Sequence, residues 1–325
     1  MITRRQMLIA SVASVLASKV AFAQEAYPQR PVTIIVPVAP GGLADIITRA
    51  AADRLSVRSG GSFLVDYVVG VGGSLGTQAV ANADPDGYTL GLVTEALLLV
   101  NPHLYENVTY TVDDFAPVGI LANMPLMILV SKDHPAQTLE ELIALAKEQP
   151  GVLSYGSSGT GTMPHLVVHQ LSNAAGISLV HVPYKSGANS VTDLIGGRLD
   201  VLAAGAPLVL GSIGEGGPLR PLAVTGNERL PDFPDLPTVN EAGVPDFALN
   251  NPWWGLVAPS GTPPSVIEQL NTWLALDSMT EAELELLAAT KLEPSFTDAE
   301  GMAQVLETEG PVWEALVAEM GITLE

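Results

Sequence analysis

Short apolar runs alternate with helical patterns along most of the chain. Residues 32–37 form an apolar run of strand length, and residues 44–55 repeat apolar positions at helical spacing. The same succession recurs, which predicts an α/β fold with mixed, mostly parallel sheets flanked by helices. Further strands are predicted at 63–69, 88–93, 126–130, 153–155, 178–182, 199–203 and 219–225.

The order of these elements predicts two lobes. Roughly three hundred residues usually divide into two domains, because a single hydrophobic core stops growing near that size. We expect lobe one to comprise residues 24–125 and 250–325, and lobe two to comprise residues 126–249. Two hinge crossings are then expected, near 126–132 and near 225–254. A ligand cleft should lie between the lobes, where strands end and helices begin.

The first residues have the features of a secretory signal peptide. Arg4 and Arg5 form a basic start, residues 7–16 are largely apolar, and Ala21-Phe22-Ala23 is a small-x-small cleavage motif. We therefore expect residues 1–23 to be removed and the mature protein to lie in the periplasm. The arginine pair also fits a twin-arginine signal, so the sequence leaves two export routes open. An uncleaved anchor is disfavoured, since serines and a lysine interrupt the apolar stretch.

Composition excludes several classes of function. Without its first 23 residues the chain has 11 basic against 35 acidic side chains, so nucleic acid, which needs a basic surface, is not an expected partner. Cysteine is absent, which excludes disulfides, thiol catalysis and cysteine-bound metals. An anionic ligand must be held by local donors, such as N–H groups at helix N-termini, because the overall field does not favour it.

Two glycine-rich loops, one in each predicted lobe, are candidate ligand sites. Residues 37–45 (PVAPGGLAD) and 155–162 (YGSSGTGT) each follow a predicted strand and open a helix. Their free backbone N–H groups and the positive end of the helix dipole suit a carboxylate. The competing interpretation is that both segments are only tight turns and helix caps.

A series of short motifs runs along the whole mature chain. The motifs are YPQRPVTIIVP (27–37), PGG (40–42) with Asp45, DPDGYTL (84–90), NPHLY (101–105), YGSSG (155–159) with Gly161, Thr162 and His165, HVPYK (181–185), DLxGG (193–197) with Asp200 and Val201, PTVxEAG (237–243), and WG (254–255) with Ala258 and Pro259. In this order they resemble the substrate-binding proteins of tripartite tricarboxylate transporters, the Bug family of extracytoplasmic receptors. The resemblance implies a two-lobed periplasmic binding protein of the Venus-flytrap kind, type II-like.

The resemblance also implies a function and a site. Such a receptor closes on a small organic acid and serves integral membrane transporter subunits, and we expect this one to be a monomer. In that family two loops clamp the ligand carboxylate. Carried onto this chain, the ligand-binding residues are Ala39, Gly41, Gly42, Asp45 and Thr94 from lobe one, and Ser157, Gly161, Thr162, His165, Tyr184, Lys185 and Ala188 from lobe two.

Two positions depart from the family pattern. Residues 67–70 (YVVG) stand where the family commonly has an asparagine and a basic residue. Glu95 follows Thr94, where small hydroxyl residues are usual. If Glu95 faces the cleft, it selects a monocarboxylate, or an acid with an amine or hydroxyl group, because a second negative group would be repelled. Alternatively, Glu95 caps the next helix and points to solvent.

Enzymatic and metal-binding interpretations are weaker. Residues 156–160 (GSSGT) resemble a nucleophile elbow but lack its final glycine, so an esterase-like hydrolase is only an alternative. His165 and His169 have helical spacing for a shared metal, yet no third ligand is evident; a capping His165 and a packed His169 are favoured. We therefore expect no catalysis, no cofactor and no metal. A binding protein that serves a sensory receptor is the other alternative.

Cleavage after Ala23 is directly testable. Mass spectrometry of protein recovered from the periplasm should show an N-terminus at Gln24, or within one or two residues of it, because the small-x-small motif ends there. A mature protein that keeps Met1 would contradict the export prediction.

Overall fold

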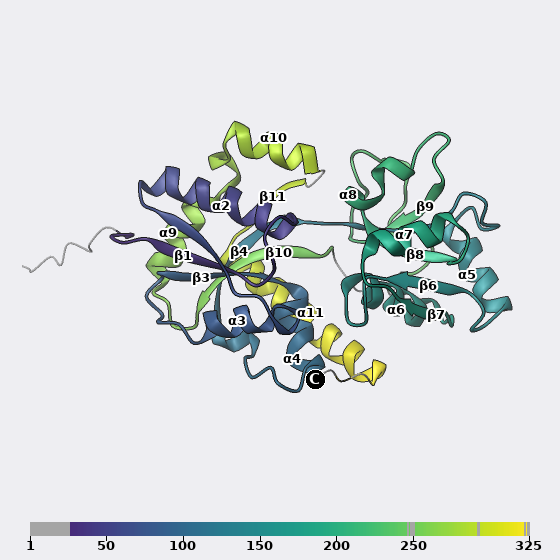
Figure 1. The fold of residues 1–325 in the computed structure, drawn as a ribbon, viewed down its shortest axis with the longest axis horizontal. Helices are drawn as coiled ribbons and strands as arrows, with labels where there is room; N and C mark the ends of the chain where they lie inside the picture. Colours follow the sequence, from purple (N-terminus) through teal and green to yellow (C-terminus); the bar gives the residue numbers. More distant parts are fainter. Residues whose placement is uncertain (1–26, 246, 248–250, 291–292, 322, 324–325) are drawn as a thin grey trace, which may run out of the picture.

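The structure, a computed structural model, describes residues 27–245, 247, 251–290, 293–321 and 323. The predicted signal peptide at 1–23 lies outside the described residues. The chain folds into two lobes, each a sheet flanked by helices, that are joined by a narrower connection (Figure 1). Within the described part of the chain, no helix is both long and apolar enough to span a bilayer.

Lobe one contains a six-stranded sheet with the order β11-β4-β10-β3-β1-β2. In this sheet β2, β1 and β3 pair in parallel. By contrast, β10 is antiparallel to β3 and β4, and β11 is antiparallel to β4. The strands are β1 (Val32–Val36), β2 (Phe63–Tyr67), β3 (Thr89–Thr94), β4 (Phe115–Asn123), β10 (Trp253–Pro259) and β11 (Glu293–Thr297).

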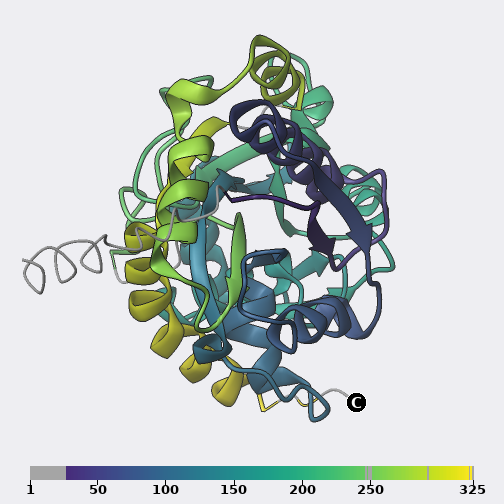
Figure 2. The same cartoon turned by 90° about the vertical axis from the view of Figure 1, so that its left-hand side faces the viewer.

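Helices cover both faces of this sheet. Neighbouring residues of a strand point to opposite faces, and apolar side chains on both faces are buried under helices. Leu92 belongs to the core that includes α2 and α9, while the next residue, Val93, belongs to the core that includes α11. Figure 1 shows α2 and α10 above the sheet and α3 and α4 below it, and Figure 2 shows the same separation from the side of lobe one. The helices are α2 (Leu43–Ser59), α3 (Ser74–Ala81), α4 (Asn101–Leu104), α9 (Pro264–Leu274), α10 (Glu281–Thr290) and α11 (Ala299–Met320).

Lobe two contains a five-stranded sheet with the order β7-β6-β8-β5-β9. Its helices also divide between two faces. Ile128 shares a core with α5 and α6, and the next residue, Leu129, shares a core with α7. The elements are β5 (Leu126–Ser131), α5 (Leu139–Glu148), β6 (Ser154–Ser157), α6 (Met163–Ala175), β7 (Val180–Pro183), α7 (Gly187–Ile195), β8 (Val201–Gly205), α8 (Ala206–Val209) and β9 (Leu219–Val224).

Both sheets are mixed, as predicted, but they contain more antiparallel pairing than the sequence suggested. β5 runs antiparallel to β8 and β9, and β10 runs antiparallel to β3 and β4. A parallel pair requires a crossover connection that returns the chain to the starting edge of the sheet. These two strands enter their sheets from the other lobe, without such a crossover helix, and therefore pair antiparallel. The parallel arrangement holds for β1, β2 and β3 and for β6, β7 and β8.

The two segments that cross between the lobes are joined by hydrogen bonds. The Met124 N–H donates to the Pro252 carbonyl at 2.7 Å. Beside it, the fully buried Thr225 accepts the Leu126 N–H on its hydroxyl at 2.9 Å and donates its own N–H to the Leu126 carbonyl at 2.8 Å. The same hydroxyl donates to Asn251 Oδ1 at 3.0 Å. Thr225 thus connects the outgoing and returning segments at one point.

A buried ion pair anchors α2 within lobe one. Arg54 Nη2 lies 3.0 Å from Glu283 Oε1 of α10, and both side chains are almost fully buried. Arg54 Nη1 also donates to the Leu274 carbonyl at the end of α9, at 2.7 Å. Burial raises the pKa of Glu283 and lowers the pKa of Arg54, because desolvation penalises both charges, while each charge partly offsets the effect on the other. The pair therefore joins three helices.

Arg54→Met is expected to destabilise the protein by about 3–5 kcal/mol, because it leaves the buried Glu283 carboxylate without its partner. Combining it with Glu283→Leu should recover most of that loss, since no buried charge is left. Urea unfolding of the wild type and both variants measures these effects. A single variant as stable as the double variant would contradict this role of the ion pair.

Candidate ligand site between the lobes

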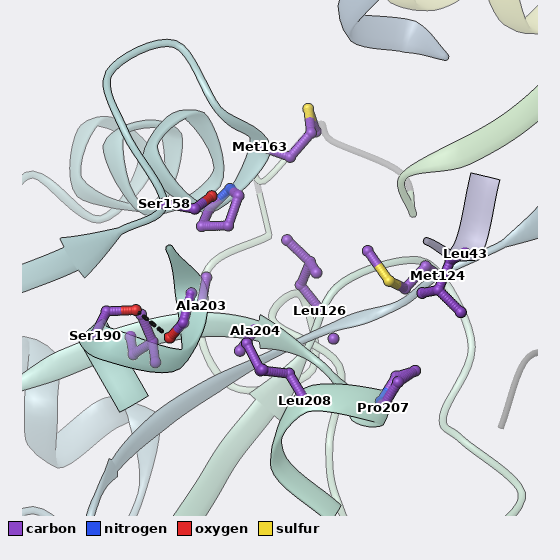
Figure 3. A pocket seen from close by; sticks show the side chains of 14 residues that line it. Leu43, Met124, Leu126, Ser158, Met163, Ser190, Ala203, Ala204, Pro207 and Leu208 are labelled. Carbon is purple, nitrogen blue, oxygen red and sulfur yellow. Dashed lines mark hydrogen bonds between the residues drawn. The ribbon is translucent and has the colours of Figure 1, made fainter. Parts of the chain in front are cut away.

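A cavity of about 300 Å³ lies between the two lobes. Lobe two forms most of its wall, and Leu43 of lobe one and Met124 of the crossing segment complete it (Figure 3). This volume is at the lower end of the usual range for small-molecule sites. The lining residues are Leu43, Met124, Leu126, Ser158, Met163, Pro164, Gly187, Ser190, Leu202, Ala203, Ala204, Gly205, Pro207 and Leu208.

Three helices begin at this cavity. The first residues of α2, α6 and α7 are Leu43, Met163 and Gly187, and all three line it. Each helix follows a strand of a parallel pair, so it starts at the edge of the sheet where those strands end. Neither Gly42 before α2 nor Thr162 before α6 provides a side-chain cap. The Ser186 hydroxyl caps α7 by accepting the Asn189 N–H. Uncapped first-turn N–H groups of α2 and α6, and the positive ends of all three helix dipoles, therefore lie at the cavity.

The wall of the cavity is mostly apolar, with Ser158 and Ser190 as the hydroxyl-bearing residues among its described lining. None of the described residues that line it has a charged side chain. The Ser190 hydroxyl is used within α7, where it donates to the Gly187 carbonyl at 2.7 Å (Figure 3). An anion in this cavity would therefore be held by helix N-termini and not by lysine or arginine.

Asp45 holds the first glycine-rich loop in shape. Its Oδ2 accepts the Gly41 N–H at 2.8 Å. Its Oδ1 accepts from Arg49 Nε at 2.8 Å and from the Tyr67 hydroxyl at 2.5 Å. The hydrogen bond from Tyr67 is the largest cause that lowers the pKa of the Asp45 carboxyl, and Gly41 and Arg49 add to it. Both oxygens of this buried carboxylate are thus engaged within lobe one.

The second loop is held by hydrogen bonds among its own residues. The Ser157 hydroxyl, which is fully buried, donates to the Gly159 carbonyl at 2.9 Å and accepts the Gly159 N–H at 3.1 Å. Thr162 Oγ1 donates to the same carbonyl at 2.7 Å. The Gly161 N–H donates to His165 Nδ1 at 3.1 Å, so His165 caps the loop, as the sequence indicated. These polar groups are used within lobe two.

Stacked rings lie beside this loop. His165 stacks on His181 with ring centroids 3.8 Å apart, and Tyr155 stacks on His181 at 4.9 Å. His181 Nε2 lies 2.7 Å from Ser157 Oγ. Burial, with smaller contributions from His181 and His169, lowers the pKa of His165 to about 4. The His165 ring is therefore neutral at neutral pH, and its unprotonated Nδ1 can accept the loop N–H.

The two loops share one construction. In each, the glycine two residues before the helix has positive φ, 95° at Gly41 and 79° at Gly161, a conformation that favours glycine. Its N–H donates to the side chain four residues later, Asp45 or His165, in the first turn of the helix. The bond resembles one half of a capping box. This hydrogen bond fixes the loop and does not use the N–H groups of the first helical residues.

The third loop carries Tyr184 and Lys185, whereas Ala188 is the second residue of α7. The Tyr184 hydroxyl donates to Asp193 Oδ2 at 2.8 Å, and Asp193 Oδ1 pairs with Arg198 at 2.7 Å. Lys185 and Ala188 are exposed and lie outside the set of described residues that line the cavity. The phenol is thus tied to α7, and the lysine is free of the cavity wall in this arrangement.

Four of the predicted site residues are next to a cavity-lining residue in the sequence, and none of the predicted residues is itself among the described lining residues. Gly42, Ser157 and Thr162 each precede a lining residue, and Ala188 follows one. The loops that the sequence identified therefore reach the cavity, although its wall is formed by their neighbours. In the first loop, the predicted residues Ala39, Gly41 and Gly42 are exposed.

The sequence reasoning missed the apolar part of the wall. Residues 203–208 lie where β8 ends and α8 begins, and this position after a strand end was the available signal. Met124 and Leu126 come from the crossing segment. Which side of that segment faces a cavity depends on how the lobes are arranged, so no local pattern identifies these two residues.

Thr94 and Glu95 lie outside this lining, and both expectations for Glu95 were wrong. The Glu95 side chain is only 2% exposed, so it does not point to solvent. Its Oε2 accepts the N–H of the buried Trp253 at 2.9 Å, behind the end of β3. Burial, with a further contribution from Glu309, raises the pKa of Glu95 to about 8. Thr94 Oγ1 accepts the Leu97 N–H at 3.3 Å and supports the next helical turn.

Two lobes, each a mixed sheet flanked by helices, with a cavity between them match the architecture of two-lobed solute-binding proteins. The profile of the family described as tripartite tricarboxylate transporter family receptor matches residues 47–322. The chain belongs to this family. A relative, the UPF0065 protein in the tcbD-tcbE intergenic region of Pseudomonas sp. (strain P51), is 34% identical over 319 residues, which cover 97% of this chain and 94% of the relative.

Solved structures share the fold over nearly the whole chain. A TctC solute-binding protein from Polaromonas without ligand has a TM-score of 0.81 at 27% identity, covering 90% of this chain and 99% of that one. Rpa4515 of R. palustris with adipate has a TM-score of 0.73 at 33% identity, covering 91% and 99%. MatC (Rpa3494) from Rhodopseudomonas palustris with bound malate has a TM-score of 0.70 at 27% identity, covering 90% and 100%.

Glu95→Gln is expected to change the pH dependence of stability. The folded pKa of about 8 exceeds the ordinary value of 4.5. The neutral carboxyl therefore stabilises the folded wild type at low pH, and this stabilisation is lost as pH rises from 4.5 through 8. Glutamine stays neutral, and its side-chain oxygen can still accept the Trp253 N–H. Between pH 5 and pH 8.5, the free energy of unfolding of the variant should therefore rise relative to that of the wild type by on the order of a few kcal/mol.

Urea unfolding of both proteins at a series of pH values measures this difference. Since the other titratable groups are common to both proteins, the difference isolates position 95. Parallel pH profiles would show that no buried acid titrates there.

Proposed function

We propose that the protein is exported to the periplasm, binds a small carboxylate-containing organic acid between its lobes, and presents it, as a monomer, to the membrane subunits of a tripartite tricarboxylate-type transporter. One observation carries this proposal: three helices from two lobes begin at one cavity, whose described lining residues include no cation. Export is supported by the signal-peptide features of residues 1–23.

A carboxylate is the group that suits this arrangement. Backbone N–H groups at a helix N-terminus form charge-assisted hydrogen bonds with anions, and the helix dipole adds to the attraction. A cation would face the positive ends of several helix dipoles. The chain as a whole has 35 acidic and 14 basic residues, so attraction at the site has to act at short range.

The predicted site residues take two roles in this proposal. Gly42 and Thr162, which precede α2 and α6, leave the first-turn N–H groups uncapped, and the small residues of the first loop allow a ligand to approach the backbone. Asp45, Ser157 and His165 hold the loops in shape through the bonds described above. On closure of the lobes, the two helix N-termini would meet the same carboxylate from opposite sides.

Two similar proteins support the class of ligand. Rpa4515 was solved with adipate and MatC with malate, and both ligands are carboxylates. Each of these proteins aligns with at least 90% of this chain. The family description, a receptor of tripartite tricarboxylate transporters, supports delivery to a membrane transporter.

A hydrolytic function has less support. Ser157 and His181 are 2.7 Å apart, as in a nucleophile and its base. However, Ser157 has no exposed surface, and its hydroxyl is engaged by Gly159. A substrate does not reach this hydroxyl in the described arrangement. The contact instead supports the shape of the second loop.

Leu43→Pro tests the role of the α2 N-terminus. Proline at the first helical position removes one N–H donor and keeps the helix, and the extended backbone of Gly42 accepts a following proline. Relative to the matched variant Leu43→Ala, which keeps the N–H, we expect carboxylates to bind about ten- to a hundredfold more weakly. This corresponds to losing a hydrogen bond to a charged group, about 1.5–3 kcal/mol. Calorimetric titration measures the difference.

The titrations use benzoate, hexanoate, succinate, adipate and citrate, each beside its amide. At least one acid should bind, and its amide should not, because only the acid carries the negative charge. Equal affinities of Leu43→Pro and Leu43→Ala, or amides that bind as tightly as their acids, would overturn the proposed carboxylate site.

A further inference from the structure

The cavity also selects the part of the ligand beyond its carboxylate. We propose that the ligand is a monocarboxylate with an apolar, ring-sized body, and not a di- or tricarboxylate; this inference rests on the proposed carboxylate-binding function. The carboxylate lies at the helix N-termini, and the body lies against the apolar wall drawn in Figure 3.

The apolar wall offers no partner for a second charge. It is formed by Met124, Leu126, Ala204 and Leu208, with Pro207 beside them (Figure 3). Proline has no N–H, so the second residue of the short α8 contributes no donor. A second carboxylate against these side chains would lose hydration without gaining a cation. A methyl group or a ring in the same place leaves water for an apolar surface.

Basic side chains near the site are paired or lie outside the cavity. Arg49 pairs with Asp45 at 2.8 Å, and Arg198 pairs with Asp193 at 2.7 Å. Lys185 is exposed and is not one of the described residues that line the cavity. A second ligand charge at the wall therefore has no described cation to neutralise it.

Two glycines make room for the apolar wall. A Cβ built on Gly187 would lie 2.8 Å from Leu208 Cδ2, and a Cβ built on Gly205 would lie 2.7 Å from Met124 Sδ. Any side chain at these positions would displace Leu208 or Met124. Gly205 has φ −69° and ψ 149°, which other residues adopt, so its close packing against Met124 explains the glycine. A methionine sulfur also packs favourably against the edge of a ring.

Shape-matched acids test the proposal. 4-Methylbenzoate and terephthalate differ only in whether a methyl group or a carboxylate stands at the far end, and hexanoate and adipate differ in the same way on a flexible body. In calorimetric titrations of the purified mature protein at pH 7.5, we expect 4-methylbenzoate to bind at least tenfold more tightly than terephthalate. Hexanoate should likewise bind more tightly than adipate.

Leu208→Arg should reverse this preference. The new guanidinium would face the far end of the ligand, so terephthalate should gain at least tenfold in affinity while 4-methylbenzoate loses. Val57→Arg is the matched control, because Val57 is exposed and lies fourteen residues along α2 from Leu43, roughly 21 Å. It adds the same charge and should leave the preference unchanged.

Gly205→Ala provides a second variant that keeps the backbone conformation. By displacing Met124 it should weaken 4-methylbenzoate more than the smaller propionate. The inference would be overturned if terephthalate or adipate bound as tightly as its monocarboxylate partner. It would also be overturned if Val57→Arg reversed the preference between 4-methylbenzoate and terephthalate as strongly as Leu208→Arg does. If no carboxylate of either series binds, the proposed function fails instead.

Discussion

The direction of the parallel strands decides where the helices of this protein begin. β1, β6 and β7 are each followed by a helix, and strands that pair in parallel end at the same edge of their sheet. α2, α6 and α7 must therefore start at those edges, and the first residue of each lines the cavity between the lobes. The chain direction thus gathers N–H groups and dipoles at one place, before any side chain contributes.

Side chains in the loops act mainly on the loops themselves. Asp45 and His165 occupy equivalent positions in the two lobes and accept the N–H of a glycine four residues earlier. One is an anion and the other is a neutral ring, so the construction depends on an acceptor at this position and not on its charge. In the proposed site, contact with a solute is then left to backbone groups and to the apolar residues around them.

Much of this arrangement could be predicted from local sequence. Glycine-rich turns between a strand and a helix identified the two loops, because such turns have few structural alternatives. Glu95 could not be placed, since its partner Trp253 lies 158 positions away and its burial depends on how β10 returns to the sheet. The antiparallel pairing of β5 and β10 and the contribution of Met124 to the wall also depend on the crossing segments. The predictions failed where distant segments meet.

The hydroxyl of Thr225 has a consequence for how the lobes move. Because it bonds to both crossing segments, neither segment can shift along the other without breaking a buried hydrogen bond. We therefore expect the connection to permit bending and to resist sliding. Repeated opening and closing would bring the same faces together each time, so that discrimination between solutes rests on the shape of a fixed wall and not on the path of the motion.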